Sequence, residues 1–191
     1  MTYHALRSGP EDGPRLFTFH GTGGDETQFH DLARRMRPDA RVISPRGDVS
    51  EHGALRYFRR TGEGVYDMDD LWLRARAMAD FMRAEGDGPA MAFGYSNGAN
   101  ILAAVLMIAP DLIGRAGLLH PLIPWSPEPV PLDGTRVLVT SGDRDPICPA
   151  PLTRALEGWL EANGAAVETL RHPGGHELRP EEAQALATFL A

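Results

Sequence analysis

The sequence lacks several residue types and patterns, and each absence narrows what the protein can do. It contains no lysine among its 19 basic residues, which excludes a lysine nucleophile or Schiff base. Its one cysteine, Cys148, excludes an intrachain disulfide and favours a reducing compartment. The longest apolar run, residues 101–109, is too short to cross a bilayer, and the first residues lack the apolar core of a signal peptide. These absences predict a cytoplasmic protein without membrane insertion.

Charge and motif content exclude further classes of protein. The net charge of -7 argues against nucleic acid as a partner. No Gly-Lys-Ser/Thr or G-x-G-x-x-G pattern points to a nucleotide, and the seven histidines show no H-E-x-x-H spacing. We therefore expect neither a metal nor an organic cofactor. The sequence leaves monomer and homodimer both open.

Apolar strand-like runs alternate with segments of helical periodicity along the 191 residues, which indicates a single domain. Strands are predicted at residues 3–6, 16–20, 41–44, 90–94, 116–120, 137–141 and 167–170. Helices are predicted at residues 26–36, 69–85, 97–108, 151–163 and 180–190, the first with a capping box formed by Asp25 and Gln28. This alternation is typical of an α/β fold with a mainly parallel sheet covered by helices on both faces. Functional residues are then expected just after strands, at the carboxyl edge of the sheet.

A serine lies between two glycines where a predicted strand meets a predicted helix. Gly94-Tyr95-Ser96-Asn97-Gly98 matches G-x-S-x-G, the nucleophile elbow. The sharp turn strains the serine backbone, and side chains two residues to either side would collide, which explains the glycines. The alternative is a glycine-bounded turn whose serine only caps the helix.

An activated serine needs a base and an acid, which in this chain order follow as aspartate and then histidine. Asp143 and Asp145 both follow the strand at 137–141, and Asp145 is favoured because neighbouring prolines stiffen its turn. His172 and His176 follow the last strand. His176 is favoured because two glycines before it let the chain curl back over the sheet, whereas His172 is interpreted as a surface residue.

Developing negative charge on a substrate carbonyl requires two hydrogen-bond donors. The glycine-rich loop at residues 20–26 follows a strand and opens a helix, as the loop of an oxyanion hole does. We expect the backbone amides of Thr22 and Asn97 to supply the two donors.

Together these segments resemble the phospholipase/carboxylesterase family of α/β-hydrolases, which includes acyl-protein thioesterases and small bacterial carboxylesterases. The resemblance rests on four motifs in order, namely H-G-T-G-G-D-E, G-Y-S-N-G, G-D-R-D-P-I-C-P and G-H. It implies an α/β-hydrolase fold with about seven strands, Ser96 as nucleophile, Asp145 as acid, His176 as base, and Thr22 and Asn97 as oxyanion donors. The chain is shorter than familiar members, with no insertion long enough for a lid domain.

The expected reaction is hydrolysis of a small carboxylic ester through an acyl-enzyme. Thioesterase or lysophospholipase action with the same triad is an alternative, and a ligand sensor with an idle triad is a second. Substrate contacts are expected from Tyr57 and Phe58 in the cluster 56–60, from Tyr95, and from His120 and Leu122. The cluster could equally be a solvated basic turn, and residues 120–125 could equally be loop packing.

Overall fold

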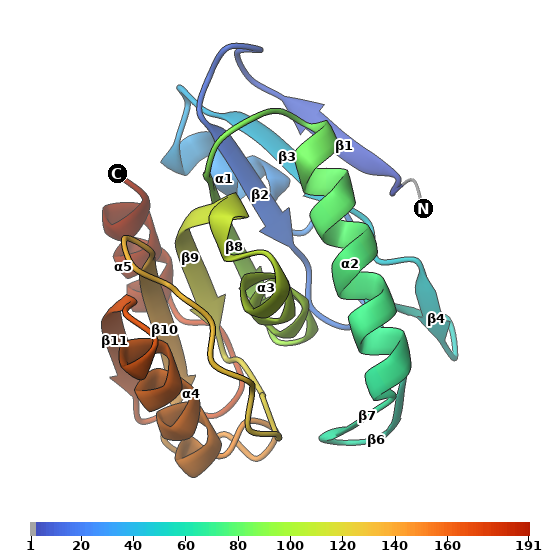
Figure 1. Ribbon diagram of the computed structural model, residues 1–191, viewed down its shortest axis with the longest axis vertical. Helices are drawn as coiled ribbons and strands as arrows, with labels where there is room; N and C mark the ends of the chain where they lie inside the picture. Colours follow the sequence, from blue (N-terminus) through green and yellow to red (C-terminus); the bar gives the residue numbers. More distant parts are fainter. Residues whose placement is uncertain (1–2) are drawn as a thin grey trace.

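A seven-stranded sheet forms the centre of the protein (Figure 1) in the computed structural model, which describes residues 3–191. Only β1 runs antiparallel to its neighbour β3, and every other adjacent pair is parallel. The strands in spatial order are β1 (Ala5–Ser8), β3 (Arg41–Pro45), β2 (Arg15–Phe19), β8 (Ala90–Tyr95), β9 (Ile113–Leu119), β10 (Arg136–Gly142) and β11 (Ala166–His172). The predicted fold class is therefore confirmed, with strand ends displaced by a few residues.

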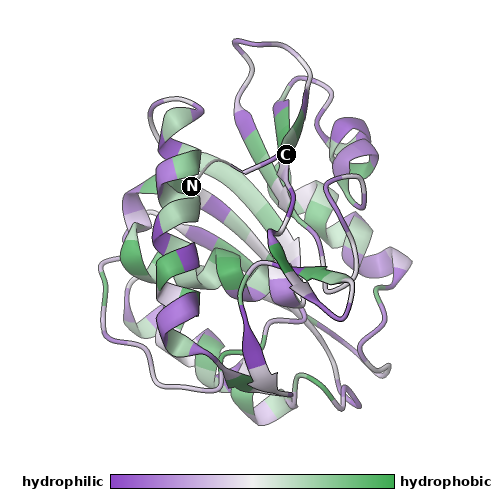
Figure 2. Cartoon of the chain, turned by 90° about the vertical axis from the view of Figure 1, so that its right-hand side faces the viewer, coloured by the Kyte–Doolittle hydropathy of each residue, from purple (hydrophilic) through white to green (hydrophobic). Residues whose placement is uncertain are grey.

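Helices cover both faces of the sheet, and each face has its own apolar cluster. One cluster includes sheet-facing residues of α2, α3 and α4, and the other includes those of α1 and α5. Figure 2 shows apolar and polar residues alternating along α2, whereas α3 is apolar and buried along almost its whole length. The helices are α1 (His30–Met36), α2 (Met68–Ala84), α3 (Asn97–Ile108), α4 (Ala150–Ala162), α5 (Pro180–Leu190) and the short 3-10 helix η1 (Pro110–Leu112). No helix in the described part of the chain has both the length and the apolar character needed to span a membrane.

Helix α1 begins later than the sequence predicted, and the capping box does not form. Phe29 stands at the N-cap without a side-chain hydrogen bond. Asp25 instead accepts from the amide and hydroxyl of Thr27, and the Gln28 side chain accepts from the Gly21 amide at 2.8 Å. Of the two residues expected to cap the helix, Gln28 therefore binds the glycine-rich loop, and Asp25 binds Thr27 in the turn before α1.

Two small hairpins, which the sequence analysis did not predict, lie between β3 and α2. They are β4 (Val49–Glu51) with β5 (Ala54–Arg56), and β6 (Arg60–Gly62) with β7 (Val65–Tyr66). The amide of Gly23 donates to the carbonyl of Leu55 at 3.0 Å, so the first hairpin holds the glycine-rich loop from outside.

The chain leaves two adjacent central strands toward opposite faces of the sheet. The loop after β2 leads to α1 on one face, whereas the elbow after β8 leads directly into α3 on the other. This divergence opens a crevice at the carboxyl edge, which is where ligands bind in open α/β sheets.

Candidate active site

Ser96 occupies a strained turn between β8 and α3. Its backbone angles are φ 53° and ψ -117°, in a region that residues with a side chain rarely adopt. A Cβ at Gly94 would press on the backbone of Gly98, and one at Gly98 would press on the backbone of Phe19 and His20. The two glycines are therefore required by close backbone contacts, as the motif predicted.

A continuous line of hydrogen bonds joins Ser96 to His176 and Asp145. The Ser96 Oγ lies 2.9 Å from His176 Nε2, and His176 Nδ1 lies 2.7 Å from Asp145 Oδ2. Asp145 is buried, whereas Asp143, the other candidate acid, has an exposed side chain. The three residues follow β8, β10 and β11, so the parallel sheet brings them to one edge.

The loops that carry Asp145 and His176 dock on each other through backbone contacts. The amide of Arg144 donates to the Gly174 carbonyl at 2.9 Å, and the amide of Asp143 donates to the His172 carbonyl at 2.8 Å. A Cβ at Gly142 would collide with the Gly174 and Gly175 carbonyls, so only glycine permits this approach. The distance between acid and base is thus set by a rigid backbone junction.

Burial and hydrogen bonds act in opposite directions on Asp145. Burial raises the pKa of this carboxyl. Four hydrogen bonds outweigh that effect, so the net pKa lies below its ordinary value; they come from the Cys148 amide, His120, His176 and the Ile147 amide. The two amides bond Oδ1 at 2.8 and 2.9 Å, which leaves Oδ2 for the histidines. Asp145 therefore remains a carboxylate at neutral pH.

The predicted oxyanion donors flank the serine. Thr22 follows β2, Asn97 begins α3, and both line the cavity beside Ser96. Among the described residues neither amide has a hydrogen-bond acceptor, although the amides of Gly21 and Gly23 on either side of Thr22 do. The Thr22 hydroxyl accepts from buried Arg56 at 2.8 Å, which orients that residue. Two amides without an acceptor in the described chain thus belong to residues that line the cavity at Ser96.

The cavity at Ser96 has a volume of about 280 Å³. Tyr95 and Leu122, two of the predicted substrate contacts, line it. Tyr57, Phe58 and His120 do not line it, and all three side chains are completely buried. The prediction that these three residues contact substrate is therefore wrong. The full lining is Thr22, Arg56, Arg60, Glu63, Tyr66, Tyr95, Ser96, Asn97, Asn100, Leu122, Ile147, Cys148 and His176.

Two of the three buried side chains, Tyr57 and Phe58, have supporting contacts that explain their positions. The Tyr57 hydroxyl donates to the Pro45 carbonyl and accepts from the His20 amide, and the Tyr57 amide donates to the Asn97 side chain at 2.8 Å. Phe58 packs edge-on against Tyr66. These aromatic residues support the site from behind rather than contact its contents.

Sequence reasoning missed two polar residues in the cavity wall. The Tyr66 hydroxyl donates to the Leu122 carbonyl at 2.9 Å and accepts from Asn100 Nδ2, while Asn100 Oδ1 accepts from the Leu122 amide. Asn100 lies one helical turn after Ser96, and an asparagine at that spacing before an apolar run is the signal that could have identified it. Tyr66 offered no signal because its position depends on the hairpins.

The sequence left two interpretations of the cluster at residues 56–60, a contact with substrate and a solvated basic turn. The structure has features of both. Arg56 and Arg60 line the cavity, and both pair with Glu51, while Arg60 also pairs with Glu63. The four charges sum to zero. Their pairing gives this wall of the cavity a balanced polar character rather than a net positive charge.

His172 is buried, not on the surface as predicted, and it belongs to a cluster with His120 and Glu182. The His120 and His172 Nε2 atoms lie 3.0 and 3.2 Å from the two Glu182 carboxylate oxygens. Such a group has ligand types suited to a metal ion. Hydrogen bonds within the protein account for the close approach of these nitrogen and oxygen atoms.

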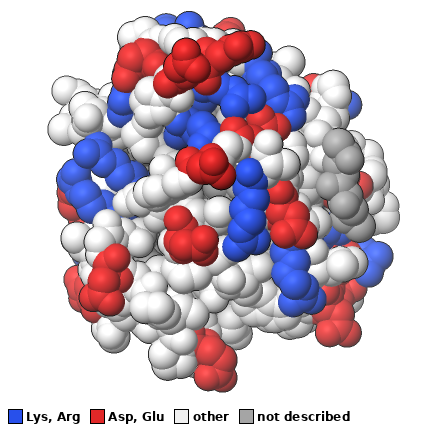
Figure 3. Space-filling model, turned by 45° about the horizontal axis from the view of Figure 1, so that its top comes forward, with Lys and Arg blue, Asp and Glu red and all other residues white. Residues whose placement is uncertain are grey.

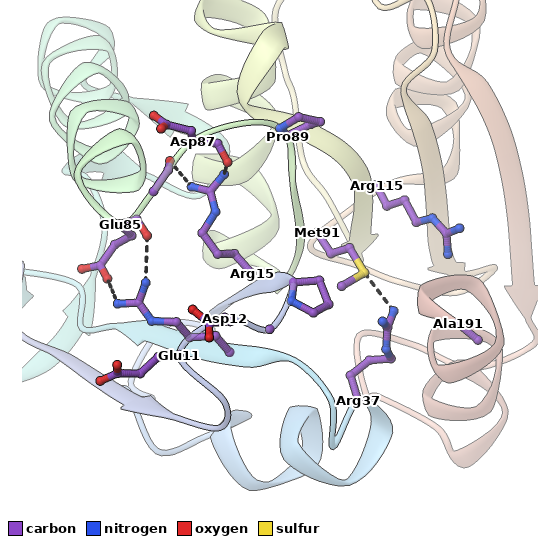
Figure 4. A pocket seen from close by; sticks show the side chains of 14 residues that line it. Glu11, Asp12, Arg15, Arg37, Glu85, Asp87, Pro89, Met91, Arg115 and Ala191 are labelled. Carbon is purple, nitrogen blue, oxygen red and sulfur yellow. Dashed lines mark hydrogen bonds and ion pairs between the residues drawn. The ribbon is translucent and has the colours of Figure 1, made fainter.

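A second, larger cavity of about 510 Å³ lies at the opposite end of the sheet (Figure 4). Its arginines bind helix ends. Arg15 donates to the Met82 carbonyl at the end of α2, and Arg41 binds Glu85, while Arg115 donates to the Phe189 carbonyl of α5 at 3.0 Å. Cations at these positions complement the helix dipoles.

On the face seen in Figure 3, acidic and basic side chains are intermixed rather than separated by sign.

No family model matches the chain. The chain is 36% identical over 188 residues to MhqD of Bacillus subtilis (strain 168), a proposed hydrolase, covering 95% of this chain and 94% of MhqD. Protein Atu2452 of unknown function from Agrobacterium tumefaciens str. C58 is 52% identical, with a TM-score of 0.94 over 98% of this chain and 95% of that one. The Bacillus cereus carboxylesterase is 33% identical, with a TM-score of 0.92 over 97% and 92% of the two chains.

The sheet order and the turn between β8 and α3 define an α/β-hydrolase. More narrowly, the chain belongs to the phospholipase/carboxylesterase family, and it is an ester hydrolase. Its length agrees with that of these relatives, since each alignment covers more than nine-tenths of both chains.

Proposed function

We propose that this enzyme hydrolyses small carboxylic esters through a Ser-His-Asp triad and an acyl-enzyme intermediate. The observation that carries the proposal is the hydrogen-bonded line from Ser96 Oγ through His176 to Asp145, with distances of 2.9 and 2.7 Å. A serine hydroxyl becomes a good nucleophile only when a base accepts its proton, and an oriented imidazole does so.

Each step uses groups of this chain. His176 Nε2 accepts the Ser96 proton as Oγ attacks the ester carbonyl, and the amides of Thr22 and Asn97 bind the oxyanion. His176 then gives its proton to the leaving alcohol. In the second half, His176 takes a proton from water, which attacks the acyl-enzyme, and returns that proton to Ser96 as the acid leaves.

Cavity size supports a short acyl group. Ligand pockets commonly measure roughly 300–1,000 Å³, and the cavity at Ser96, about 280 Å³, lies at the lower end. Its wall is held by the paired polar groups of Tyr66, Asn100 and Leu122, so widening it would break hydrogen bonds. A long acyl chain has no enclosed space here.

The substrate test compares p-nitrophenyl acetate, butyrate, octanoate and palmitate with acyl thioesters of the same chain lengths. We expect the highest kcat/KM for acetate or butyrate, and a loss of at least about 10³-fold in Ser96→Ala. A clear preference for long-chain thioesters would replace the esterase assignment with thioesterase action.

A fluorophosphonate probe tests whether the serine is activated at all. Wild type should be labelled at Ser96, and Ser96→Ala should remain unlabelled while keeping its fold. If wild type also remains unlabelled, the chain is a ligand sensor in which the triad is idle.

A further inference from the structure

A second imidazole lies against the carboxylate that orients His176. His120 follows β9 directly, is completely buried, and has a backbone φ of 51°. Its Nδ1 lies 2.8 Å from Asp145 Oδ2, the same oxygen that His176 Nδ1 approaches at 2.7 Å. On the other side of the ring, Nε2 lies 3.0 Å from Glu182 Oε1. A non-glycine residue held at positive φ in the interior marks a conformation that the surroundings impose.

Counting donors and acceptors assigns the protons in this cluster. An ionised carboxylate only accepts hydrogen bonds, so a ring that bonds two carboxylates must carry a proton on each nitrogen. Asp145 Oδ1 and both oxygens of Glu182 already accept from other donors, which are the amides of Ile147, Cys148 and Arg179 and the Thr140 hydroxyl. Neither acid therefore needs a proton of its own. His120 is the imidazolium between them.

His172 completes the count without a second positive charge. Its Nδ1 accepts from the Gly174 amide at 3.1 Å, so its proton is on Nε2, which lies 3.2 Å from Glu182 Oε2 and 3.5 Å from His120 Nε2. At 3.5 Å the two Nε2 atoms lie at the outer limit of hydrogen-bond distance, whereas His120 Nε2 lies 3.0 Å from Glu182 Oε1, so the carboxylate is the nearer partner of the His120 proton. This count places one cation between two anions.

The electrostatics of the surroundings agree with this assignment. Burial lowers the pKa of His120, but the hydrogen bonds to Glu182 and Asp145 outweigh it and raise the pKa above its ordinary value. The groups that face the His120 ring are Asp145 after β10, Glu182 on α5, His172 at the end of β11, His176, and the ring of Tyr95.

We propose that His120 is a positioning residue that acts as an imidazolium, holding Asp145 from the side opposite His176 and offsetting part of its negative charge. Glu182 is its counter-ion. The proposal rests on the triad described above. The His120 and His176 ring centres are 5.2 Å apart, so the fixed cation lies beside the base that Asp145 orients, and we expect the pH profile of kcat/KM to depend on it.

Two variants separate the charge of His120 from its hydrogen bond. In His120→Asn, the side-chain amide can still donate to Asp145 but carries no charge, and asparagine tolerates positive φ. The negative charges of Asp145 and Glu182 then have no cation between them. We therefore expect the acidic side of the pH profile of kcat/KM, its acid limb, to shift to higher pH by about one unit. Adding Glu182→Gln removes the second anion and should return the limb most of the way to the wild-type position. An unmoved limb in an active, folded His120→Asn variant overturns the proposal.

Nitrogen NMR of histidine-labelled protein tests the charge without any variant of the cluster. We expect both His120 nitrogens to be protonated at pH 7.5, and the same signals in Ser96→Ala, which cannot turn over. An unprotonated nitrogen on His120 at that pH overturns the proposal. A bound zinc ion that keeps the Nε2 atoms of His120 and His172 unprotonated also overturns it. Activity surviving in Ser96→Ala would instead refute the proposed triad and leave the His120 result intact.

Discussion

The Tyr95 hydroxyl donates a 2.6 Å hydrogen bond to the main-chain carbonyl of His176. Tyr95 immediately precedes Ser96, so one bond ties the end of the nucleophile strand to the loop that carries the base. The Tyr95 ring also lies beside the His176 ring, with centres 5.3 Å apart. Ser96 and His176, which are 80 residues apart in the chain, are thus held in place relative to each other by the side chain next to the nucleophile.

Replacing Tyr95 by phenylalanine should lower kcat more than it raises KM. The substitution keeps the ring but leaves the His176 carbonyl without its donor, a loss of about 1 kcal/mol that falls on the position of the base. We expect kcat to fall about tenfold, measured with p-nitrophenyl acetate. Urea unfolding checks that the fold survives, and an unchanged kcat would show that the loop holds His176 without Tyr95.

Asp145→Asn should lower kcat by about 10⁴-fold, as expected when the acid of a triad loses its charge and its acceptor geometry. Asp143→Asn is the matched control, because it makes the same change two residues away on an exposed side chain. It should leave kcat within about twofold of wild type. Equal losses in both variants would mean that the loop, not the carboxylate, is responsible.

Gly98→Ala should destabilise the protein by about 1–3 kcal/mol, because the new methyl group would press on the backbone of Phe19 and His20. Gly158 provides the control. It lies on α4 with open space around it, so Gly158→Ala should raise stability by about 0.5–1 kcal/mol through helix propensity. Chemical denaturation of both variants measures the difference. Similar stability in the two would contradict the steric argument for the elbow.

The thiol of Cys148 should be unreactive in the native protein although it borders the cavity. Burial raises the thiol pKa, and the charges of Asp145 and Glu63 raise it further. The thiol also donates a hydrogen bond to the His120 carbonyl, 3.2 Å away. We expect Ellman's reagent to find no reactive thiol at pH 8 in native protein and one per chain in urea. Rapid reaction of native protein would show that the cavity opens to solvent at this residue.

Stability should decline at both ends of the pH range because of the His120 cluster. The carboxyl pKa values of Asp145 and Glu182 are lowered from 3.8 and 4.5, so their contribution is present above those values and is lost as pH falls through the lower folded values. The pKa of His120 is raised from 6.5, so its contribution is complete below 6.5 and is lost as pH rises through the higher folded value. Urea unfolding between pH 3 and pH 10 measures both losses. In His120→Asn the alkaline loss should be smaller, and an unchanged alkaline limb would assign it to other groups.

Sequence patterns predicted the structure correctly where the relevant contacts are between residues close in the chain. The alternation of strands and helices indicated the parallel sheet, and G-x-S-x-G indicated the strained turn at Ser96, because both depend on near neighbours and on chain order. The same patterns failed at Asp25 and Gln28: the Gln28 side chain binds the glycine-rich loop at Gly21, and the Asp25 side chain binds Thr27, so neither caps the helix. They favoured Asp145 over Asp143 only through the neighbouring prolines, whereas in the structure burial separates these two aspartates, and burial is not local.

The sequence by itself determined the fold class and the order in which serine, aspartate and histidine follow their strands. Only the tertiary structure decided that Tyr57 and Phe58 lie behind the cavity, that Tyr66 and Asn100 form its wall, and that His120 touches Asp145 instead of substrate. The reason is that a side chain's partners across a sheet are set by which strands become neighbours and how tightly helices pack on them. His120, Asp145 and Glu182 come from three separate elements, and only packing places one cation between two anions.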